Sequence, residues 1–297
     1  MTNLAPPEIP GIEIRQDVPV GKFTSISIDC RAKALVVADS DEGLGEFLRW
    51  AHANDVPWHM LGGGTNCFFA DDYYDGYVIK LGQAFRDIKI HGHLIRVGCA
   101  LPLSRLLNIA VAENLTGIEF LWDIPGTVGG AVTGNSGSAN QSIGSFVEAV
   151  RGYTPAGERF ACKKGGYEFE YRNSALRGMV VTEAVLRLVH DSPEAIEERL
   201  AHYKKLRQIQ PAGVKSSGCV FKNPPDHSAG QLIDECGLKG TTVGGAMVST
   251  DHANYIVNKN KATAQDILEL IMQVQQTVKE QKDIDLSVEV QIIQSPR

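Results

Sequence analysis

The first eighty residues alternate between helix-like and strand-like hydrophobic patterns. Between Asp41 and Asn54, apolar side chains recur at helical spacing, which predicts an amphipathic helix. The next segment, VPWHML, predicts a short strand that runs directly into the glycines at 62–64, and DGYVIKL predicts another strand soon after. We therefore expect a β-α-β-turn-β unit that ends near Lys80.

The middle of the chain, residues 82–190, is richer in short strands and glycine turns. One helix is expected at residues 102–114, and the alternation from Val180 to Leu188 predicts a half-buried strand. Ser192 and Pro193 then mark a helix start, because serine caps a first turn and proline fits its first position. That helix carries one apolar stripe and should lead into a last domain. The stripe consists of Ile196, Leu200, Tyr203 and Leu206.

The last domain is expected to hold a strand around NYIVN, a long helix and a final strand, LSVEVQII. Thr263 and Asp266 form a capping pair at the start of the helix. In the final strand, Glu289 lies on the polar face, opposite the apolar face. Periodicity alone therefore predicts a solvent-facing Glu289.

Composition narrows the class of protein. The chain has 297 residues, of which 43% are hydrophobic, and a net charge of -6, which disfavours nucleic acid or an anionic membrane as the main partner. The N-terminus shows no signal-peptide pattern, and no apolar run has the roughly 18 residues of a membrane span. We expect a cytoplasmic monomer, with room for a local basic pocket that binds a phosphate group.

The six cysteines form no C-x-x-C pair and no histidine cluster accompanies them, so no metal site is expected. In a cytosolic chain of this length the thiols should be reduced. Cys219, within SSGCVFKNP, is then a free thiol. On its own it is best explained as a small buried hydrophobic residue.

Two glycine-rich stretches are the first candidate site. LGGGTN at residues 61–66 follows a predicted strand, and its backbone N–H groups could face an anion, although three glycines also fit a tight turn. The chain has no P-loop motif, and Cys67 occupies the third glycine position of a G-x-G-x-x-G pattern. The second stretch, IPGTVGGAVTGNSGS, covers residues 124–138. We interpret the two stretches as opposite walls of one cofactor site.

Together these segments resemble a known family. LGGGTN, GIEFLWDIPGTVGGAVTGNSG, EYRNS, SSGCVFKNP, AGQLIDECGLKG, DHANYIVN and LSVEV, in this order from about residue 57 to residue 293, look like UDP-N-acetylenolpyruvoylglucosamine reductase, also called UDP-N-acetylmuramate dehydrogenase. The short stretch between EYRNS and SSGCVFKNP resembles the branch of the family that lacks an extra substrate-covering loop.

The resemblance implies an α+β chain with an FAD-binding fold of the vanillyl-alcohol-oxidase type. Residues 1–80 and 81–190 would be two α+β subdomains that bind FAD, and residues 191–297 an α+β substrate-binding domain. It also implies reduction of UDP-N-acetylglucosamine enolpyruvate to UDP-N-acetylmuramate, driven by NADPH, in peptidoglycan precursor synthesis. Hydride would pass from flavin N5 to the terminal carbon of the enolpyruvyl group.

The same matching assigns roles residue by residue. Arg172, Cys219 and Glu289 would be catalytic, with Cys219 at the position where the family usually has a serine proton donor. The substrate would contact Tyr171, Lys222, Asn223 and Asn254. FAD would contact Leu61, Gly62, Gly63, Gly64, Thr65, Asn66, Pro125, Gly126, Thr127, Gly129, Gly130, Ala131, Gly134, Asn135 and Gly137.

The chemistry suits these residue types. Negative charge builds on the substrate carboxylate, and an arginine provides planar, bidentate donors that stay charged. A buried acid such as Glu289 can share a hydrogen bond with the enol-like intermediate if it is protonated. A thiol, with an ordinary pKa of about 8.5, is a proton donor at neutral pH unless a nearby cation such as Lys222 makes it a thiolate. Outside the motif, Arg172 would be a surface ion pair.

Some details depart from the family. KFTSISIDC has Asp29 and Cys30 where the family usually has glycines beside the flavin, and NSGSAN replaces a similar family segment. His227 and His252 have no assigned role, and a structural hydrogen bond is an equal explanation for His252.

Two alternatives remain open: a flavin oxidoreductase of the same fold with another substrate, and a non-catalytic module that binds a sugar nucleotide. A Rossmann dehydrogenase is disfavoured because Gly82 and Gln83 offer no acid for a ribose.

Overall fold

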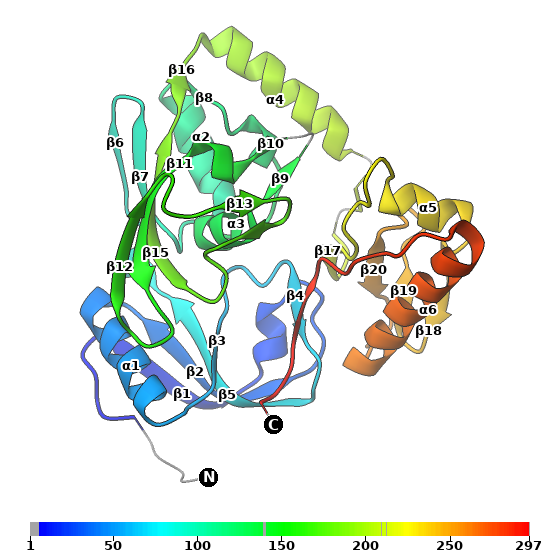
Figure 1. Cartoon of the computed structure of the whole chain (residues 1–297), viewed down its shortest axis with the longest axis horizontal. Helices are drawn as coiled ribbons and strands as arrows, with labels where there is room; N and C mark the ends of the chain where they lie inside the picture. Colours follow the sequence, from blue (N-terminus) through cyan, green and yellow to red (C-terminus); the bar gives the residue numbers. More distant parts are fainter. Residues whose placement is uncertain (1–5, 139–140, 209, 212, 297) are drawn as a thin grey trace. The chain divides into compact units, whose positions relative to one another are not determined.

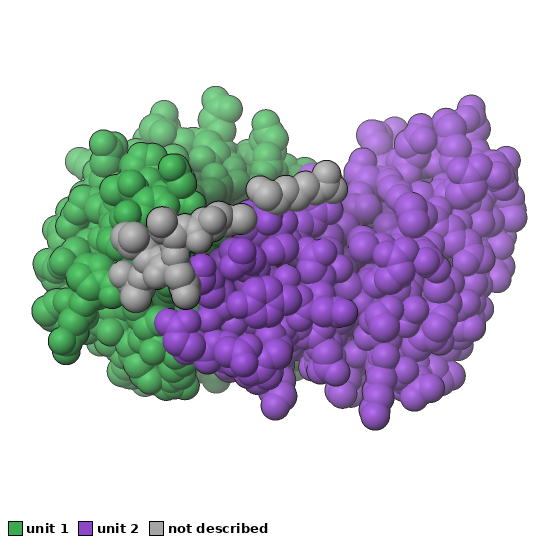
Figure 2. All heavy atoms as spheres, turned by 90° about the horizontal axis from the view of Figure 1, so that it is seen from below, with its two compact units in different colours: residues 1–15, 34–63, 77–208 green, residues 16–33, 64–76, 209–297 purple. Residues whose placement is uncertain are grey.

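The computed structural model describes residues 6–138, 141–208, 210–211 and 213–296. Figure 1 shows the course of the chain, and its contacts divide it into two compact units (Figure 2). Unit 1 comprises residues 1–15, 34–63 and 77–208, and unit 2 comprises residues 16–33, 64–76 and 209–297. Each unit is described separately below.

The first sheet has the strand order β1-β2-β5-β3 and is covered by α1. Its strands are β1 (Ile12–Val18), β2 (Arg31–Ala38), β5 (Tyr73–Leu81) and β3 (Trp58–Met60), and α1 spans Asp41–Ala53. Ser40 caps α1, since its side chain accepts a hydrogen bond from the N–H of Gly43. β3 and β5 are parallel, so the 61–63 glycine segment leaves the sheet at the carboxyl end of β3. The predicted opening unit is confirmed.

The second sheet of unit 1 is antiparallel, with α3 packed against β15 and β7. Its order is β12 (Arg159–Lys163), β11 (Val147–Tyr153), β15 (Val180–Arg187), β7 (Leu94–Gly98) and β6 (Ile88–His91). The helices beside it are α2 (Leu103–Ala112), α3 (Val128–Gly134) and α4 (Pro193–Arg207). Short turns of 3-10 helix lie at η2 (Gln83–Phe85), η3 (Glu119–Leu121) and η4 (Ile143–Phe146). The predicted cap at Ser192 is confirmed, because its side chain accepts from the N–H of Ala195.

Three two-stranded pairs complete unit 1. They are β8 (Leu115–Thr116) with β16 (Val189–His190), β9 (Gly137–Ser138) with β10 (Gln141–Ser142), and β13 (Phe169–Glu170) with β14 (Asn173–Ser174). The last of these is a hairpin that carries only Tyr171 and Arg172 at its tip. A predicted functional arginine therefore lies on a two-residue turn.

Unit 2 is built on a four-stranded antiparallel sheet covered by α5 and α6. The order is β17 (Ser216–Cys219), β20 (Tyr255–Asn258), β19 (Ala246–Val248) and β18 (Thr242–Val243), with α5 at Ala229–Glu235, α6 at Ala264–Lys282 and η1 at Val20–Phe23. The predicted capping box of Thr263 and Asp266 at the start of α6 is confirmed. A parallel pair joins β4 (Cys67–Phe69) to β21 (Gln291–Ile293).

The final strand is shorter than the alternation predicts. Val288 makes only an isolated bridge to Phe221, and the regular strand begins at Gln291. Two residues before Val288, the carbonyl of Leu286 accepts a hydrogen bond from the side chain of Gln275 and not from a neighbouring strand. The backbone around Glu289 is therefore held by individual contacts and not by the continuous hydrogen bonds of a strand pair.

Three hydrophobic cores lie in the described part of the chain: beneath α1, beside the five-stranded sheet, and between the four-stranded sheet and α6. Their number agrees with three domains, and the boundaries at 80 and 190 stay a prediction. The compact units differ from these boundaries in two respects. The helix expected in the third domain, α4, packs Ile196 and Leu200 into the core of the five-stranded sheet. Segments 16–33 and 64–76 group with unit 2, because Ile26, Ile28 and Phe68 fill its core.

Candidate functional site

In unit 1 the two glycine stretches meet. A Cβ atom on Gly63 would lie 2.7 Å from the Cα of Gly126, and one on Gly62 would lie 2.8 Å from the Oγ1 of Thr127. Any side chain at these two positions would therefore collide with the other stretch. The sequence predicted that both stretches serve one site, and here they are in direct contact.

Backbone donors remain available at this contact. Within the described residues, the N–H groups of Gly62 and Gly63 have no hydrogen-bond acceptor, and Gly63 is exposed. The start of α3 offers fewer donors, because the N–H groups of Val128 and Gly129 bind the carbonyls of Leu101 and Cys99, each at 2.9 Å. A surface without side chains and with unused N–H groups fits the diphosphate of a dinucleotide cofactor. These observations support the FAD site expected here.

In unit 2 the loop continues with Gly64, Thr65 and Asn66. Gly64 has a φ of 65°, and a Cβ atom there would lie 2.0 Å from the carbonyl oxygen of Phe23, so the position needs glycine. The N–H of Ser25 donates to the Gly64 carbonyl at 2.8 Å. The N-terminal segment that departs from the family thus packs on the glycine loop. Within it, burial raises the pKa of the Cys30 thiol to about 12, which makes Cys30 an inert buried thiol.

The end of the second glycine stretch holds the β13–β14 hairpin in place. Asn135 ends α3 in a left-handed conformation, and its buried side chain donates to the carbonyl of Glu170 at 2.6 Å and accepts from the N–H of Gly144 at 3.0 Å. Ser174 Oγ donates to the carbonyl of Thr133 at 2.7 Å. Asn135, predicted to contact the cofactor, therefore also fixes the hairpin that carries Arg172.

Arg172 is held from both sides of the hairpin tip. Its Nη2 donates to the carbonyl of Gly137 at 2.7 Å, and its guanidinium carbon lies 5.1 Å from the ring centre of Tyr171. Its φ of 56° is in the left-handed region, which is uncommon for a residue with a side chain. Tyr171 is 52% exposed. Unit 1 therefore places the predicted arginine directly beside the predicted cofactor residue Gly137, with the ring of Tyr171 against the guanidinium.

In unit 2 the backbone brings Cys219 and Glu289 onto neighbouring segments. Cys219 ends β17 and pairs with Tyr255 of β20. The next residue, Val220, accepts the N–H of Glu289 through its carbonyl at 2.7 Å, and the N–H of Lys222 donates to the carbonyl of Ser287 at 2.8 Å. Both predicted catalytic side chains are half-buried. The backbone pairing places Glu289 beside the segment that follows Cys219, and its half-buried position differs from the solvent-facing one that periodicity alone predicts.

The side chain of Asn254 binds the backbone of this segment. Its Oδ1 accepts from the N–H of Phe221 at 2.9 Å, and its Nδ2 donates to the Phe221 carbonyl at 2.8 Å. The carbonyl of Asn254 also accepts from the N–H of Val220 at 2.8 Å. Asn254 is 3% exposed. Its place in the substrate site stays a prediction, and in the structure both ends of its amide bind the backbone of Phe221, two residues after Cys219.

The remaining predicted residues have mainly local contacts. The Oδ1 of Asn223 accepts from the N–H of Ala229 at the start of α5, at 3.0 Å. His252 Nδ1 accepts from the N–H of Asn254 at 3.2 Å, and burial lowers the pKa of His252. The structural alternative for His252 is thus observed. Lys80, which the sequence did not single out, donates to the carbonyl of Gly62 at 2.7 Å. The sequence feature that could have identified Lys80 is its charge, which interrupts the apolar run of β5.

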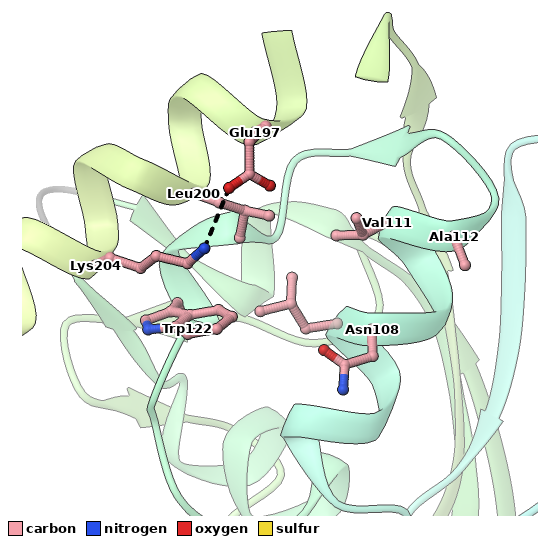
Figure 3. Close-up of a pocket in the computed structure, with 8 residues that line it drawn as sticks. Asn108, Val111, Ala112, Trp122, Glu197, Leu200 and Lys204 are labelled. Carbon is pink, nitrogen blue, oxygen red and sulfur yellow. Dashed lines mark hydrogen bonds and ion pairs between the residues drawn. The ribbon is translucent and has the colours of Figure 1, made fainter. Parts of the chain in front are cut away.

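A separate pocket of about 340 Å³ lies between α2 and α4 (Figure 3). Lys204 Nζ is 4.7 Å from the ring centre of Trp122 and 3.2 Å from Glu197 Oε1. None of its lining residues belongs to the predicted site.

Among the described residues, no cluster of three His, Cys, Asp or Glu side chains is arranged for a metal ion. The described helices also include none with the length and apolar character of a membrane span.

Comparison with known proteins agrees with this arrangement. Residues 210–293 match the C-terminal domain of UDP-N-acetylenolpyruvoylglucosamine reductase, and residues 32–163 match the FAD binding domain. The UDP-N-acetylenolpyruvoylglucosamine reductase of Clostridium botulinum is 36% identical over 280 residues, which cover 93% of this chain and 91% of that protein. The chain belongs to this reductase family.

Further comparisons support the same family and the same fold. UDP-N-acetylenolpyruvoylglucosamine reductase 1 of Bacillus cereus is 34% identical and covers 93% of both chains. The crystal structure of the Thermus caldophilus reductase superposes with a TM-score of 0.81 at 34% identity, over 96% of this chain and 99% of that one. A TM-score of 0.50 at 15% identity to 6-hydroxy-D-nicotine oxidase from Arthrobacter nicotinovorans, over 96% of this chain and 64% of that one, shows a shared fold alone. The chain is therefore an FAD-binding oxidoreductase of the reductase family, with the expected fold.

Proposed function

We propose that this protein reduces UDP-N-acetylglucosamine enolpyruvate to UDP-N-acetylmuramate, with NADPH as the reductant, in peptidoglycan precursor synthesis. The pairing of the Glu289 N–H with the Val220 carbonyl at 2.7 Å is the observation that carries the assignment, because it joins the acid to the segment of the proton donor. The relatives named for this reaction align with 93% or more of this chain and with 91% or more of their own chains.

Gly62, Gly63 and the glycine-rich segment from Pro125 to Gly137 would hold FAD, which would supply hydride transfer from NADPH to the terminal carbon of the enolpyruvyl group. The residues of this chain manage the charge and the proton that remain. The guanidinium of Arg172 stabilises the substrate carboxylate as negative charge builds on it. Tyr171 and Lys222 are assigned to substrate binding.

The Cys219 thiol gives its proton to the carbon that bears the carboxylate. A C–H bond forms, the S–H bond breaks, and the thiolate regains a proton from solvent, so the net reaction consumes NADPH and one proton. Glu289 shares a hydrogen bond with the enol-like intermediate. The half-buried position of both side chains is compatible with access to a bound substrate.

One anaerobic experiment tests the reaction. The flavin is first reduced with NADPH, UDP-N-acetylglucosamine enolpyruvate is added, and the flavin absorbance is followed. Prompt return of the oxidised band is the expected result. If NADPH bleaches the flavin and the substrate does not restore it, the substrate assignment is wrong and another flavin oxidoreductase activity takes its place. A protein without flavin would indicate a non-catalytic module.

We further infer that the enzyme works as a cytoplasmic monomer on small-molecule ligands. The supporting observations are the net charge of -6 and six cysteines of which none is joined in a disulfide. Light scattering after size-exclusion chromatography should give a mass near 32.3 kDa.

A further inference from the structure

Lys80 reaches the first glycine stretch from the neighbouring strand. It lies near the end of β5, next to Ile79, whose carbonyl accepts the N–H of Leu61 at 2.8 Å. Tyr77 and Ile79 fill the core beneath α1, and Lys80 alternates to the other face of the strand. From there its half-buried ammonium donates to the carbonyl of Gly62 at 2.7 Å.

This contact fixes one peptide group of the loop. The Gly62–Gly63 peptide is trans, so its N–H points away from its carbonyl. The carbonyl of Gly62 faces Lys80, and the N–H of Gly63 therefore faces away from Lys80. Gly63 is in close contact with Gly126, which limits rotation of the same peptide.

We propose that Lys80 is a positioning residue for the diphosphate of FAD. It holds the Gly62–Gly63 peptide so that the N–H of Gly63 is presented as a donor, and its positive charge strengthens that donor by polarising the shared peptide. The proposal rests on the FAD site of the proposed function and on neither its substrate nor its proton donor. Glycine supplies the conformation of the loop, and lysine selects the orientation of the peptide.

The test compares Lys80→Met and Lys80→Arg with the matched control Lys89→Met. Lys89 is an exposed residue of β6, and its replacement removes one positive charge in the same way as Lys80→Met. The flavin is removed, and the apoprotein is titrated with three probes: FAD, ADP, which has the diphosphate without the flavin ring, and riboflavin, which has the ring without phosphate. Circular dichroism checks that each variant is folded.

Lys80→Met is expected to weaken FAD and ADP binding by about tenfold or more, since a charge-assisted hydrogen bond that orders the loop is lost. Riboflavin binding should be unchanged. Lys80→Arg retains a charged donor and should fall between the wild type and Lys80→Met. Lys89→Met should match the wild type for all three probes.

Equal FAD binding by Lys80→Met and Lys89→Met would overturn the proposal. So would equal losses for riboflavin and ADP, because they would indicate general damage to the site. If Lys80→Met does not fold, the test uses Lys80→Arg in a salt titration. Binding of FAD and ADP that equals the wild type would then overturn the proposal, and weaker binding of FAD and ADP with unchanged riboflavin binding would support it. Failure of the UDP-sugar assay with intact FAD binding would leave this proposal standing.

Discussion

Arg172 donates a hydrogen bond from its guanidinium to the carbonyl of Gly137, at 2.7 Å, from a backbone with a φ of 56°. A left-handed conformation is unfavourable for a residue with a Cβ atom, by roughly 1–2 kcal/mol. The hairpin keeps this conformation because Asn135 and Ser174 bind its two strands to the end of α3. Local strain at a residue with a proposed catalytic role is consistent with selection for its position rather than for stability.

Replacing Arg172 should separate activity from stability. Arg172→Lys keeps a charge without the planar pair of donors, and we expect kcat/KM to fall by about 100-fold or more. In Arg172→Gly, relief of about 1 kcal/mol of backbone strain offsets a lost hydrogen bond of similar size, so Tm should change little while activity is lost. Steady-state kinetics and thermal unfolding by circular dichroism measure the two effects.

Arg177→Lys is the control for Arg172. Arg177 is exposed and donates to the carbonyl of Arg172 at 3.1 Å, and a lysine at this position can still reach that carbonyl. Its activity should match the wild type. Wild-type kcat/KM in Arg172→Lys would rule out the role of Arg172 as a carboxylate clamp.

The role of Cys219 as proton donor can be tested by measuring the rates of the two half-reactions separately. Cys219→Ala removes the donor, and we expect reoxidation of the flavin by substrate to slow by about 100-fold or more, while reduction by NADPH is unchanged. Cys219→Ser keeps a donor with a much higher pKa. Because a thiolate cannot donate, the wild-type rate should fall as pH rises through the pKa of the thiol, and the serine variant should lack this decline. Stopped-flow absorbance from pH 6 to about pH 10 measures both.

A wild-type profile that is flat to about pH 10 would contradict donation by Cys219. Ser217→Ala is a nearby control, since this buried serine donates to the carbonyl of Cys67 at 3.2 Å and has no proposed part in the reaction. Its pH profile should have the same shape as that of the wild type.

Local signals predicted the local structure well. Ser192 and Thr263 cap their helices as the sequence indicates, because a cap depends on residues only three positions apart. The two glycine-rich stretches were predicted to form opposite walls of one cofactor site, and in the structure Gly63 lies in contact with Gly126.

Contacts set by strand register could not be predicted. The amide of Asn254 binds Phe221 only because β17 and β20 pair in one particular register, with a bulge between Ser216 and Cys219. The same applies to Lys80 and Gly62, whose contact depends on the parallel pairing of β3 with β5. Sequence periodicity gives the face of a residue and does not give its neighbour across the sheet.

His59 should make stability depend on pH. Burial lowers the pKa of His59 to about 4, from an ordinary value of 6.5. The unfolded chain therefore takes up a proton between about pH 6.5 and pH 4 that the folded protein does not, and the free energy of unfolding falls as pH is lowered through this window. Because His59 is partly exposed, we expect a loss of about 1–2 kcal/mol, less than the full shift allows.

His59→Gln, which cannot be protonated, should lose less stability than the wild type between pH 7 and about pH 4.5. Urea unfolding followed by near-ultraviolet circular dichroism measures the difference at each pH. His52→Gln, at an exposed position on α1, is the control and should follow the wild type. Parallel curves for the wild type and His59→Gln would show that His59 does not titrate in this way.

Asn254 offers a variant whose defect should be reversed by acid. In Asn254→Asp, the carboxylate can still accept from the N–H of Phe221, but it faces the Phe221 carbonyl that Nδ2 contacts at 2.8 Å in the wild type. This repulsion should displace the segment after Cys219 and lower kcat/KM by about tenfold or more. Protonation supplies an O–H donor for the carbonyl, and the buried site favours it by raising the pKa of the new carboxyl.

The ratio of kcat/KM between Asn254→Asp and the wild type should therefore rise as pH falls from 8 to about 5.5, whereas the ratio for Asn254→Ala should stay low and constant. Taking the ratio removes the pH dependence that both proteins share through Cys219 and Glu289. Flavin content of each variant checks that the FAD-binding part is intact. Parallel profiles for Asn254→Asp and Asn254→Ala would mean that the hydrogen bond to the Phe221 carbonyl does not position the donor segment. A selective recovery in acid would support the hydrogen bond to the Phe221 carbonyl as the contact that positions the donor segment.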